Sequence, residues 1–270
     1  MRTHFEHQHI EAIERATCAA VPPQRLAQWP ANVNANAAAQ WLVPMDEGTV
    51  GRAHSAVPTS HSAADLACIA GIEVLYEAAG LAPAWRIAQV AAFDPLRQAL
   101  SARGYTASQS TCVQLADVSA SLQGANATAM QLVLSPAPTP AWQQVYLGPG
   151  FDAADGASRV AILARGHHTT YAVAYAMNDA AQTNPIAAGA LSIFLQSGLP
   201  QLASFHGMRT AASHRKQGIA SAIVREFAQT VHSQGIKQWF LQVEQGNSQA
   251  QSVYAKLGFS TAWVYEYWRK

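Results

Sequence analysis

The sequence predicts a mixed α/β (α+β) protein in which a central sheet is flanked by helices, built as two units along the chain. Three observations predict this class. Several segments place apolar residues at helical spacing, short runs of branched and aromatic residues lie between them, and prolines concentrate near the middle of the chain. The 270 residues also exceed the usual domain size of about 100–150 residues, which favours two domains or one large one.

The first half combines helix and strand signals. Residues 65–79 carry apolar side chains close to helical spacing and end at Gly80, and a second helix is expected over 95–103, ending at Gly104. Residues 41–44 and 111–115 are short apolar runs typical of strands. We therefore expect a mixed α/β domain over residues 1–130.

A proline-rich segment follows the first half. Pro136, Pro138 and Pro140 disfavour helix and interrupt a central strand, so residues 131–141 are expected to form a linker. The second domain would then span residues 142–270.

The second half has clearer patterns. Residues 169–177, 186–195 and 202–209 read as strands, the first two separated by turn residues, which predicts an antiparallel meander. Residues 219–231 carry an apolar helical stripe, 239–243 form a short strand buried on both faces, and 259–268 form a final strand. Asn247 is a plausible N-cap of one more helix, which Gly258 ends.

Composition excludes several function classes. The formal charge is +1 and no run of Lys and Arg occurs, so nucleic acid is not expected as a partner. No stretch reaches the roughly 18–20 apolar residues of a membrane span, and the polar N-terminus lacks the apolar region of a signal peptide, so we expect a cytoplasmic protein. Cys18, Cys68 and Cys112 fit neither a disulfide framework nor a zinc site.

Metal and hydrolase chemistry have little support. His4, His7 and His9 beside Glu6 lack further ligands, and the adjacent pair at 167–168 would point to opposite faces of a strand, so no metal site is predicted. No serine stands in a Gly-x-Ser-x-Gly context, which leaves a serine hydrolase unsupported.

The polar loop at 210–217 opens the long helix at Gly218. Backbone N–H groups at a helix start lack intrahelical partners and point outward with the positive end of the helix dipole, so they bind anions. Gly218 would let the backbone approach a pyrophosphate, small Ala220 would avoid crowding it, and Arg215 and Lys216 would add positive charge. This segment predicts a pyrophosphate site.

A second motif, Asn247-x-x-Ala250-x-x-x-Tyr254-x-x-x-Gly258-Phe259, follows one strand later. Together with Arg215-x-x-Gly218-x-Ala220, it resembles the GCN5-related N-acetyltransferase (GNAT) family, over residues 142–270. Lys216 stands where many members have glycine. The resemblance implies the GNAT acyl-CoA N-acyltransferase fold, with acetyl-CoA as co-substrate. It also implies cofactor-binding residues, namely Met208, Arg209, Thr210, Arg215, Lys216, Gln217, Gly218, Ile219, Ala220, Ser221 and Asn247. For Asn247 the alternative role is that of a helix cap alone.

The resemblance also implies the catalytic roles. The reaction is the transfer of acetyl from acetyl-CoA to a primary amine by direct attack in a ternary complex. Tyr254 would protonate the leaving thiolate, and the backbone N–H of Met208 would donate to the thioester oxygen. Glu244 is one candidate base and His206 another, its unperturbed pKa near 6.5 being suitable, while a water chain is the third alternative.

The first half is expected to choose the acceptor. Residues 75–85 align with 253–263 at an offset of 178, which suggests a degenerate first copy of the same fold, and Leu100-x-x-x-Gly104-Tyr105 offers a competing register. No loop like 215–220 occurs before the proline-rich segment, so the first half is not expected to bind CoA.

The expected acceptor is a small-molecule amine, bound by a monomer or a homodimer. Arg52, Trp85 and Arg86 are candidate residues lining its pocket. The alternative function is a non-catalytic acyl-CoA sensor that acts through a protein partner.

Overall fold

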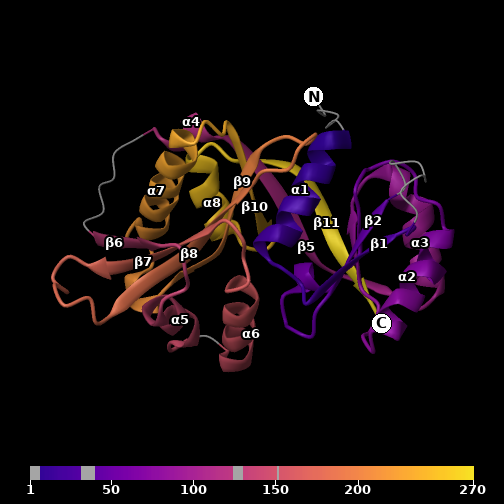
Figure 1. The fold of residues 1–270 in the computed structure, drawn as a ribbon, viewed down its shortest axis with the longest axis horizontal. Helices are drawn as coiled ribbons and strands as arrows, with labels where there is room; N and C mark the ends of the chain where they lie inside the picture. Colours follow the sequence, from indigo (N-terminus) through magenta and orange to yellow (C-terminus); the bar gives the residue numbers. More distant parts are fainter. Residues whose placement is uncertain (1–6, 32–39, 124–129, 151) are drawn as a thin grey trace.

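The computed structural model describes residues 7–31, 40–123, 130–150 and 152–270, which form a large and a small sheet with helices packed around them (Figure 1). The large sheet has eight strands in the spatial order β4-β11-β5-β10-β9-β8-β7-β6. Their bounds are β4 (Trp85–Ala88), β5 (Thr106–Asp117), β6 (Met130–Ser135), β7 (Thr169–Ala176), β8 (Pro185–Phe194), β9 (Leu202–Thr210), β10 (Gln238–Glu244) and β11 (Ser260–Arg269).

The small sheet has three antiparallel strands, β1 (Arg25–Trp29), β2 (Trp41–Met45) and β3 (Val57–Pro58). The helices are α1 (His7–Ala20), α2 (Ala67–Ala78), α3 (Asp94–Ala102), α4 (Val118–Ser121), α5 (Pro140–Leu147), α6 (Ala153–Leu163), α7 (Ile219–Ser233) and α8 (Ser248–Lys256). Three short 3-10 helices are η2 (Gly51–Ala53), η3 (Ala91–Phe93) and η4 (Ala212–His214).

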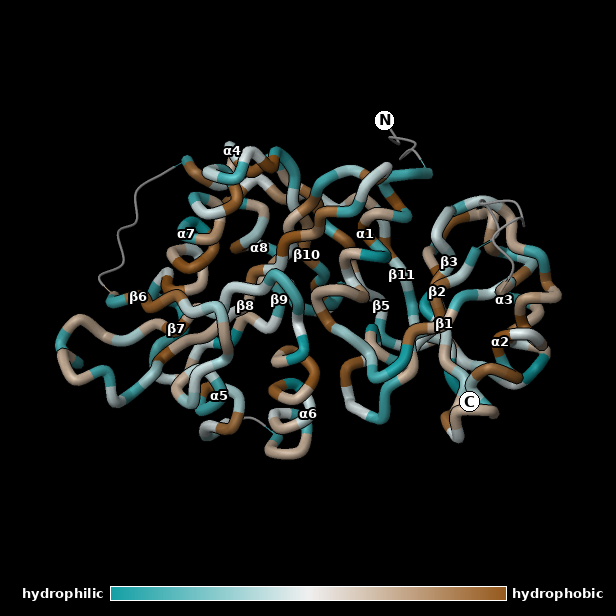
Figure 2. The backbone as a smooth tube through the Cα atoms, in the orientation of Figure 1, coloured by the Kyte–Doolittle hydropathy of each residue, from teal (hydrophilic) through white to brown (hydrophobic). Residues whose placement is uncertain are grey.

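Strand periodicity distributes side chains to the two faces of the large sheet. On β7, Ala172 and Ala174 pack toward helix α7, whereas Tyr171 and Val173 pack toward α5 and α6. The hydrophobic and hydrophilic bands along α7 reflect its amphipathic pattern (Figure 2). The sheet is thus covered on both faces, as the sequence predicts for an α/β protein.

The two halves of the chain exchange their last strands. Strand β5 of the first half lies between β11 and β10, and strand β11 of the second half lies between β4 and β5, with all three pairings antiparallel. Side chains follow the same exchange, because Trp263 and Tyr265 of β11 pack in the first half's core and Cys112 of β5 packs in the second half's core. Neither half completes its part of the sheet alone.

A single offset of 154 residues relates the two halves. It carries α3 (Asp94–Ala102) onto α8 (Ser248–Lys256), Trp85 of β4 onto Trp239 of β10, and the start of β5 onto the start of β11. The strand order β4-β11-β5-β10 then maps onto itself in reverse, as an approximate twofold axis requires. The pair Thr111 and Tyr265 maps onto itself and lies on that axis.

This correspondence decides between the two predicted registers. The offset of 178 is wrong, because it lays Tyr76 of α2 on Tyr254 of α8, whereas the topological counterpart of α2 is α7. The competing register is correct and places Gly104 on Gly258, both at positive φ after a helix. Leu100 then occupies the position of Tyr254.

The predicted linker over residues 131–141 is wrong. Met130–Ser135 is strand β6, paired in register with β7 at the edge of the large sheet, and Pro140 begins helix α5. The prolines follow the strand rather than interrupt it, and an edge strand tolerates them nearby. The two expected domains therefore share one sheet.

Most of the other predicted elements are present. Helices α2, α3, α7 and α8, strand β2 and the antiparallel meander β7-β8-β9 all lie within a few residues of the predicted bounds. Strand β5 covers Thr106–Asp117 and is much longer than the predicted 111–115. The sequence analysis missed α1, α5, α6, β1 and β4, and all three cysteines are buried.

A buried ion pair joins the N-terminal helix to the first half's sheet. The carboxylate of Glu14 on α1 lies 2.8 Å from Arg86 on β4, and both side chains are almost completely buried. The Arg86 guanidinium also lies over the ring of Tyr265, 5.3 Å from its centroid. Removing one partner would leave an uncompensated charge in the core.

We therefore expect Glu14→Ala to lower the free energy of unfolding by about 3–5 kcal/mol, the usual cost of breaking a buried pair. The double variant Glu14→Leu/Arg86→Met replaces both charges by apolar groups and should lose much less. Urea unfolding followed by circular dichroism measures both. Equal losses in the two variants would show that the buried charge is not what destabilises Glu14→Ala.

Candidate active site

Strands β9 and β10 separate after a short parallel contact. They pair only at Trp239 with Ala203 and at Phe240 with Ser204. Beyond these pairs both strands line one cavity of about 370 Å³, β9 through residues 205–209 and β10 through residues 241–244. Elements η2 and β5 of the first half and β11 of the second half also line it, so we call it the interface cavity.

A bulge in β9 shapes the wall of this cavity. The register between β8 and β9 shifts between Ala188 and Ala190, so that Gly207 and Met208 both lie opposite Gly189. Helix α5 holds both strands at this point. Trp142 Nε1 donates to the Gly189 carbonyl at 3.0 Å, and the Tyr146 hydroxyl donates to the Gly207 carbonyl.

Gly207 is required at the bulge. Its φ is +62°, and an added Cβ would lie 2.6 Å from the Tyr146 hydroxyl and 2.7 Å from Leu163. Backbone at a bulge is released from the strand ladder, so this segment can present its polar groups to the cavity.

A second cavity of about 440 Å³ lies between the start of α7 and helix α8, and we call it the loop cavity. Every residue predicted to bind the cofactor, except Gln217, lines this cavity. Arg209, Arg215 and Lys216 supply positive charge, and none of the described residues that line it is acidic. The side chain of Gln217 instead donates to the Ser213 carbonyl at 3.3 Å.

The backbone of the loop favours an anion at the helix start. Gly218 is the N-cap of α7 at φ +78°, and no side chain caps the helix. The first N–H groups of α7 therefore lack partners within the helix. Lys216, which replaces the glycine of many GNAT members, has φ +60°, the left-handed conformation that glycine adopts most easily. The loop keeps this conformation without the glycine.

The two cavities meet at Tyr254. Both are lined by Met208, Arg209, Asn247, Ala250 and Tyr254. The Tyr254 ring packs edge-on against Phe205, with centroids 5.5 Å apart. Burial raises the pKa of Tyr254 to about 12, so its hydroxyl keeps its proton at neutral pH.

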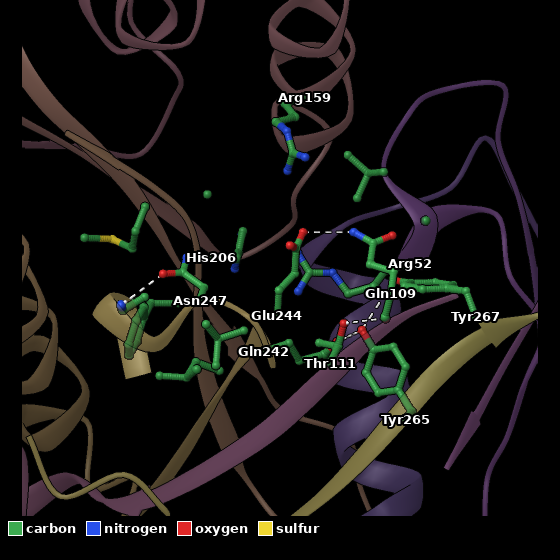
Figure 3. Close-up of a pocket in the computed structure, with 18 of the residues that line it drawn as sticks. Arg52, Gln109, Thr111, Arg159, His206, Gln242, Glu244, Asn247, Tyr265 and Tyr267 are labelled. Atoms are coloured by element: carbon green, nitrogen blue, oxygen red, sulfur yellow. Dashed lines mark hydrogen bonds between the residues drawn. The ribbon is translucent and has the colours of Figure 1, made fainter. Parts of the chain in front are cut away.

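The candidate bases differ in environment. Glu244 is exposed at the end of β10, where its carboxylate accepts from Gln109 Nε2 at 2.9 Å (Figure 3). His206 is buried, and burial together with the charge of Arg52 lowers its pKa to about 3. A group with so low a pKa is a weak base at neutral pH, so the geometry favours Glu244 or water over His206.

Asn247 caps helix α8, because its side-chain oxygen accepts from the Ala250 N–H at 3.1 Å. Among the three residues predicted to line the acceptor pocket, Arg52 lines the interface cavity and the other two line neither cavity. Trp85 packs in the core against Trp41, and Arg86 forms the buried ion pair described above, so the prediction for these two is wrong.

The sequence analysis missed several polar residues of the interface cavity. They come from segments far apart in the chain, namely Gln109, Thr111, Arg159, Gln242, Tyr265, Tyr267 and Arg269. Figure 3 labels all of these except Arg269 around the same space as Glu244 and His206. No motif marks them; the available signal was the polar face of each strand and, for Arg159, of helix α6.

The first half holds no second site of this kind. At the start of α2, the Asp65 carboxylate accepts from the Ala67 N–H at 2.9 Å and so takes the place an anion would need. Leu100, the counterpart of Tyr254, is fully buried and has no hydroxyl. Within the first half's described residues, the structure therefore repeats the fold without repeating the loop cavity's chemistry.

No group of three or more His, Cys, Asp or Glu in the described part of the chain is arranged to hold a metal ion. His4 and Glu6 lie outside the described residues. No helix in the described ranges is long and apolar enough to cross a membrane.

Comparison with known proteins finds a family model that matches most of the second half. Residues 134–259 match the model of the acetyltransferase (GNAT) family. No curated protein matches the chain.

Three solved structures share the fold. A GCN5-related N-acetyltransferase from Kribbella flavida is 15% identical, with TM-score 0.66 and coverage of 97% of this chain and 96% of that one. A tandem GNAT protein from the clavulanic acid biosynthesis pathway is 15% identical, with TM-score 0.61 and coverage of 96% and 87%. A conserved protein of unknown function from Staphylococcus epidermidis is 12% identical, with TM-score 0.59 and coverage of 81% and 85%.

The lowered pKa of His206 predicts a pH dependence of stability. As the pH falls from 6.5 toward about 3, the unfolded chain binds a proton at this histidine and the folded chain does not. The free energy of unfolding therefore decreases as the pH decreases through this window, and this histidine contributes up to about 1.4 kcal/mol per pH unit to that decrease.

Removing the imidazole in His206→Gln should flatten that decline. The measurement is urea unfolding at several pH values between 6.5 and 4, with the exposed His232→Gln as the matched control. An identical pH slope in His206→Gln and the wild type would contradict the lowered pKa.

Proposed function

Through residues 134–259 the chain belongs to the acetyltransferase (GNAT) family, and on this premise we propose that it transfers acetyl from acetyl-CoA to a primary amine of a small molecule. The observation that carries the proposal is the meeting of two cavities at Tyr254. One cavity has the charge and open helix terminus that a pyrophosphate needs, and the other is a separate polar space for the acceptor.

The residues of the loop cavity fit the cofactor. The free N–H groups at the start of α7, with Arg215 and Lys216 beside them, would hold the pyrophosphate. The backbone at the β9 bulge would pair with the pantetheine arm in the manner of an added strand. When bound, acetyl-CoA supplies an activated acetyl group as a thioester.

The remaining steps fall to residues where the cavities meet. The Met208 N–H would donate to the thioester oxygen as negative charge develops there. The Tyr254 hydroxyl would give its proton to the departing thiolate sulfur. Glu244, or water beside it, would take the proton that the attacking amine loses. Direct attack requires no covalent enzyme intermediate.

A small acceptor suits the interface cavity. About 370 Å³ lies at the lower end of the range for small-molecule pockets, roughly 300–1,000 Å³. Its walls come from both halves of the chain, so it is shaped by several segments rather than by one open groove. We propose that the first half contributes the wall that selects the amine, and that the chain works as a monomer or a homodimer.

We expect Tyr254→Phe to lower kcat by about 10- to 1,000-fold, because proton transfer to the leaving group is lost while the ring contacts remain. The affinity for acetyl-CoA should change little. Thiol release from acetyl-CoA measures kcat, and a thermal-shift titration measures cofactor binding. Unchanged turnover would remove Tyr254 from the mechanism.

We expect Gly218→Glu to abolish acetyl-CoA binding, because the carboxylate would lie at the pyrophosphate position and repel it. Gly235→Glu is the matched control, since Gly235 also has positive φ, +75°, and lies beyond the other end of α7.

At 100 times its Kd, acetyl-CoA should stabilise the wild type and Gly235→Glu by about 2.7 kcal/mol and so raise their melting temperatures. It should leave the melting temperature of Gly218→Glu unchanged. Retained affinity in Gly218→Glu would contradict the placement of the pyrophosphate. Tight binding in the wild type without turnover on a broad panel of amines would favour the acyl-CoA sensor.

A further inference from the structure

The interface cavity carries a net positive charge. Four arginines line it, Arg52, Arg159, Arg209 and Arg269, and Glu244 is the one carboxylate among its lining residues. Asp155 lies behind the lining and contacts both Arg159, at 2.7 Å, and Arg209, at 3.0 Å. Even with Asp155 counted, four cations face two anions.

Arg52 differs from the other arginines of the cavity, because the carboxylate that its charge acts on, the buried Glu14, is already paired with Arg86. No hydrogen bond or ion pair of its side chain occurs among the residues that the structure describes. Arg269 forms no ion pair within the described ranges either, but its guanidinium is packed over the Tyr267 ring, 4.6 Å from the centroid. Arg159 and Arg209 share Asp155. Arg52 is therefore the cation placed to bind an anion from outside the chain.

The positive charge of these arginines also affects the pKa values of two nearby histidines. Burial and the charge of Arg52 together lower the pKa of His206. Burial and the charge of Arg269 lower the pKa of His54. A guanidinium that forms no ion pair within the described residues binds a ligand's carboxylate or phosphate strongly, since such charge-assisted hydrogen bonds are short and often bidentate.

The charges of opposite sign come from different halves of the chain. Arg52 lies on η2 of the first half, and Glu244 ends β10 of the second half, and both line the same cavity (Figure 3). A ligand that spans them would place its amine toward Glu244 and Tyr254 and its anionic group toward Arg52. A purely cationic diamine would meet repulsion from the four arginines that line the cavity.

We propose that the acceptor is an amine that also carries an anionic group, a carboxylate or a phosphate, and that Arg52 binds this group. The proposal rests on the acetyltransferase function proposed above and specifies its substrate class. Arg52 then determines specificity from the first half, while the chemistry stays in the second.

Matched pairs of acceptors test the proposal. Lysine is compared with 1,5-diaminopentane for the carboxylate arm, and 3-aminopropyl phosphate with 3-aminopropanol for the phosphate arm. For each compound, kcat and KM are measured by thiol release at saturating acetyl-CoA. Binding is measured separately by thermal shift in the presence of CoA, so that a ligand that binds without reacting is still detected.

The variants are Arg52→Gln, Arg52→Lys and the control Arg103→Gln. Arg103 is exposed and pairs with Glu73, away from both cavities. The anionic member of at least one pair should have the higher kcat/KM. Arg52→Gln should lower that value about 10- to 100-fold, mainly through KM, and leave the neutral or cationic member unchanged. Arg52→Lys should restore part of the loss, and Arg103→Gln should behave as the wild type.

Other outcomes separate this inference from the proposed function. If the uncharged or cationic amines are acetylated as well as the anionic ones, and Arg52→Gln changes neither, the anion site is overturned and the acetyltransferase stands. If an anionic amine binds in an Arg52-dependent way without being acetylated, the anion site is supported and the proposed reaction fails. If no anionic amine binds, the inference is overturned. An unchanged acetyl-CoA thermal shift in Arg52→Gln shows that the variant is folded.

Discussion

The exchange of strands β5 and β11 is the constraint on which the rest of the structure depends. Each strand completes the part of the sheet that belongs to the other half, so the backbone hydrogen bonds of both halves are satisfied only when both are present. The pair Thr111 and Tyr265 lies where the two strands cross the approximate twofold axis, and both residues line the interface cavity. The cavity that would receive the acceptor is thus built at the junction of the halves, and each half supplies residues that the other cannot.

The two halves share a fold but differ in the groups that bind and react. In the second half, the start of α7 has no side-chain cap and is flanked by Arg215 and Lys216, which suits a pyrophosphate. In the first half, the Asp65 carboxylate bonds to the start of α2 and adds negative charge there. Leu100 stands at the position of Tyr254. The repeated architecture therefore has an uncapped, positively charged helix start in the second half, whereas the first half contributes Arg52 to the interface cavity.

Sequence reasoning succeeded where the signal is local. The stripe of α7, the cap at Asn247 and the glycine at 258 are short-range patterns, and the structure has the corresponding elements within a few residues. It failed where pairing with distant strands decides. Residues 130–135 pair with β7 although prolines follow them, because an edge strand needs hydrogen bonds on one side only. The choice between offsets of 178 and 154 likewise required the sheet order, since the match of Tyr76, Gly80 and Trp85 with Tyr254, Gly258 and Trp263 arises by chance in the wrong register.

The sequence by itself determined the α/β class, the loop at 215–220 that opens helix α7 and the position of Tyr254 on a capped helix, because each depends on residues close together in the chain. Only the tertiary structure decided that both cavities meet at Tyr254, that His206 is buried and Glu244 exposed, and that Trp85 and Arg86 belong to the core. It also decided the surroundings of Arg52, which the sequence had already singled out without reason to rank it above Trp85 or Arg86. The physical reason is that burial, charge and strand pairing depend on neighbours that lie tens to hundreds of residues away, and no local pattern records them.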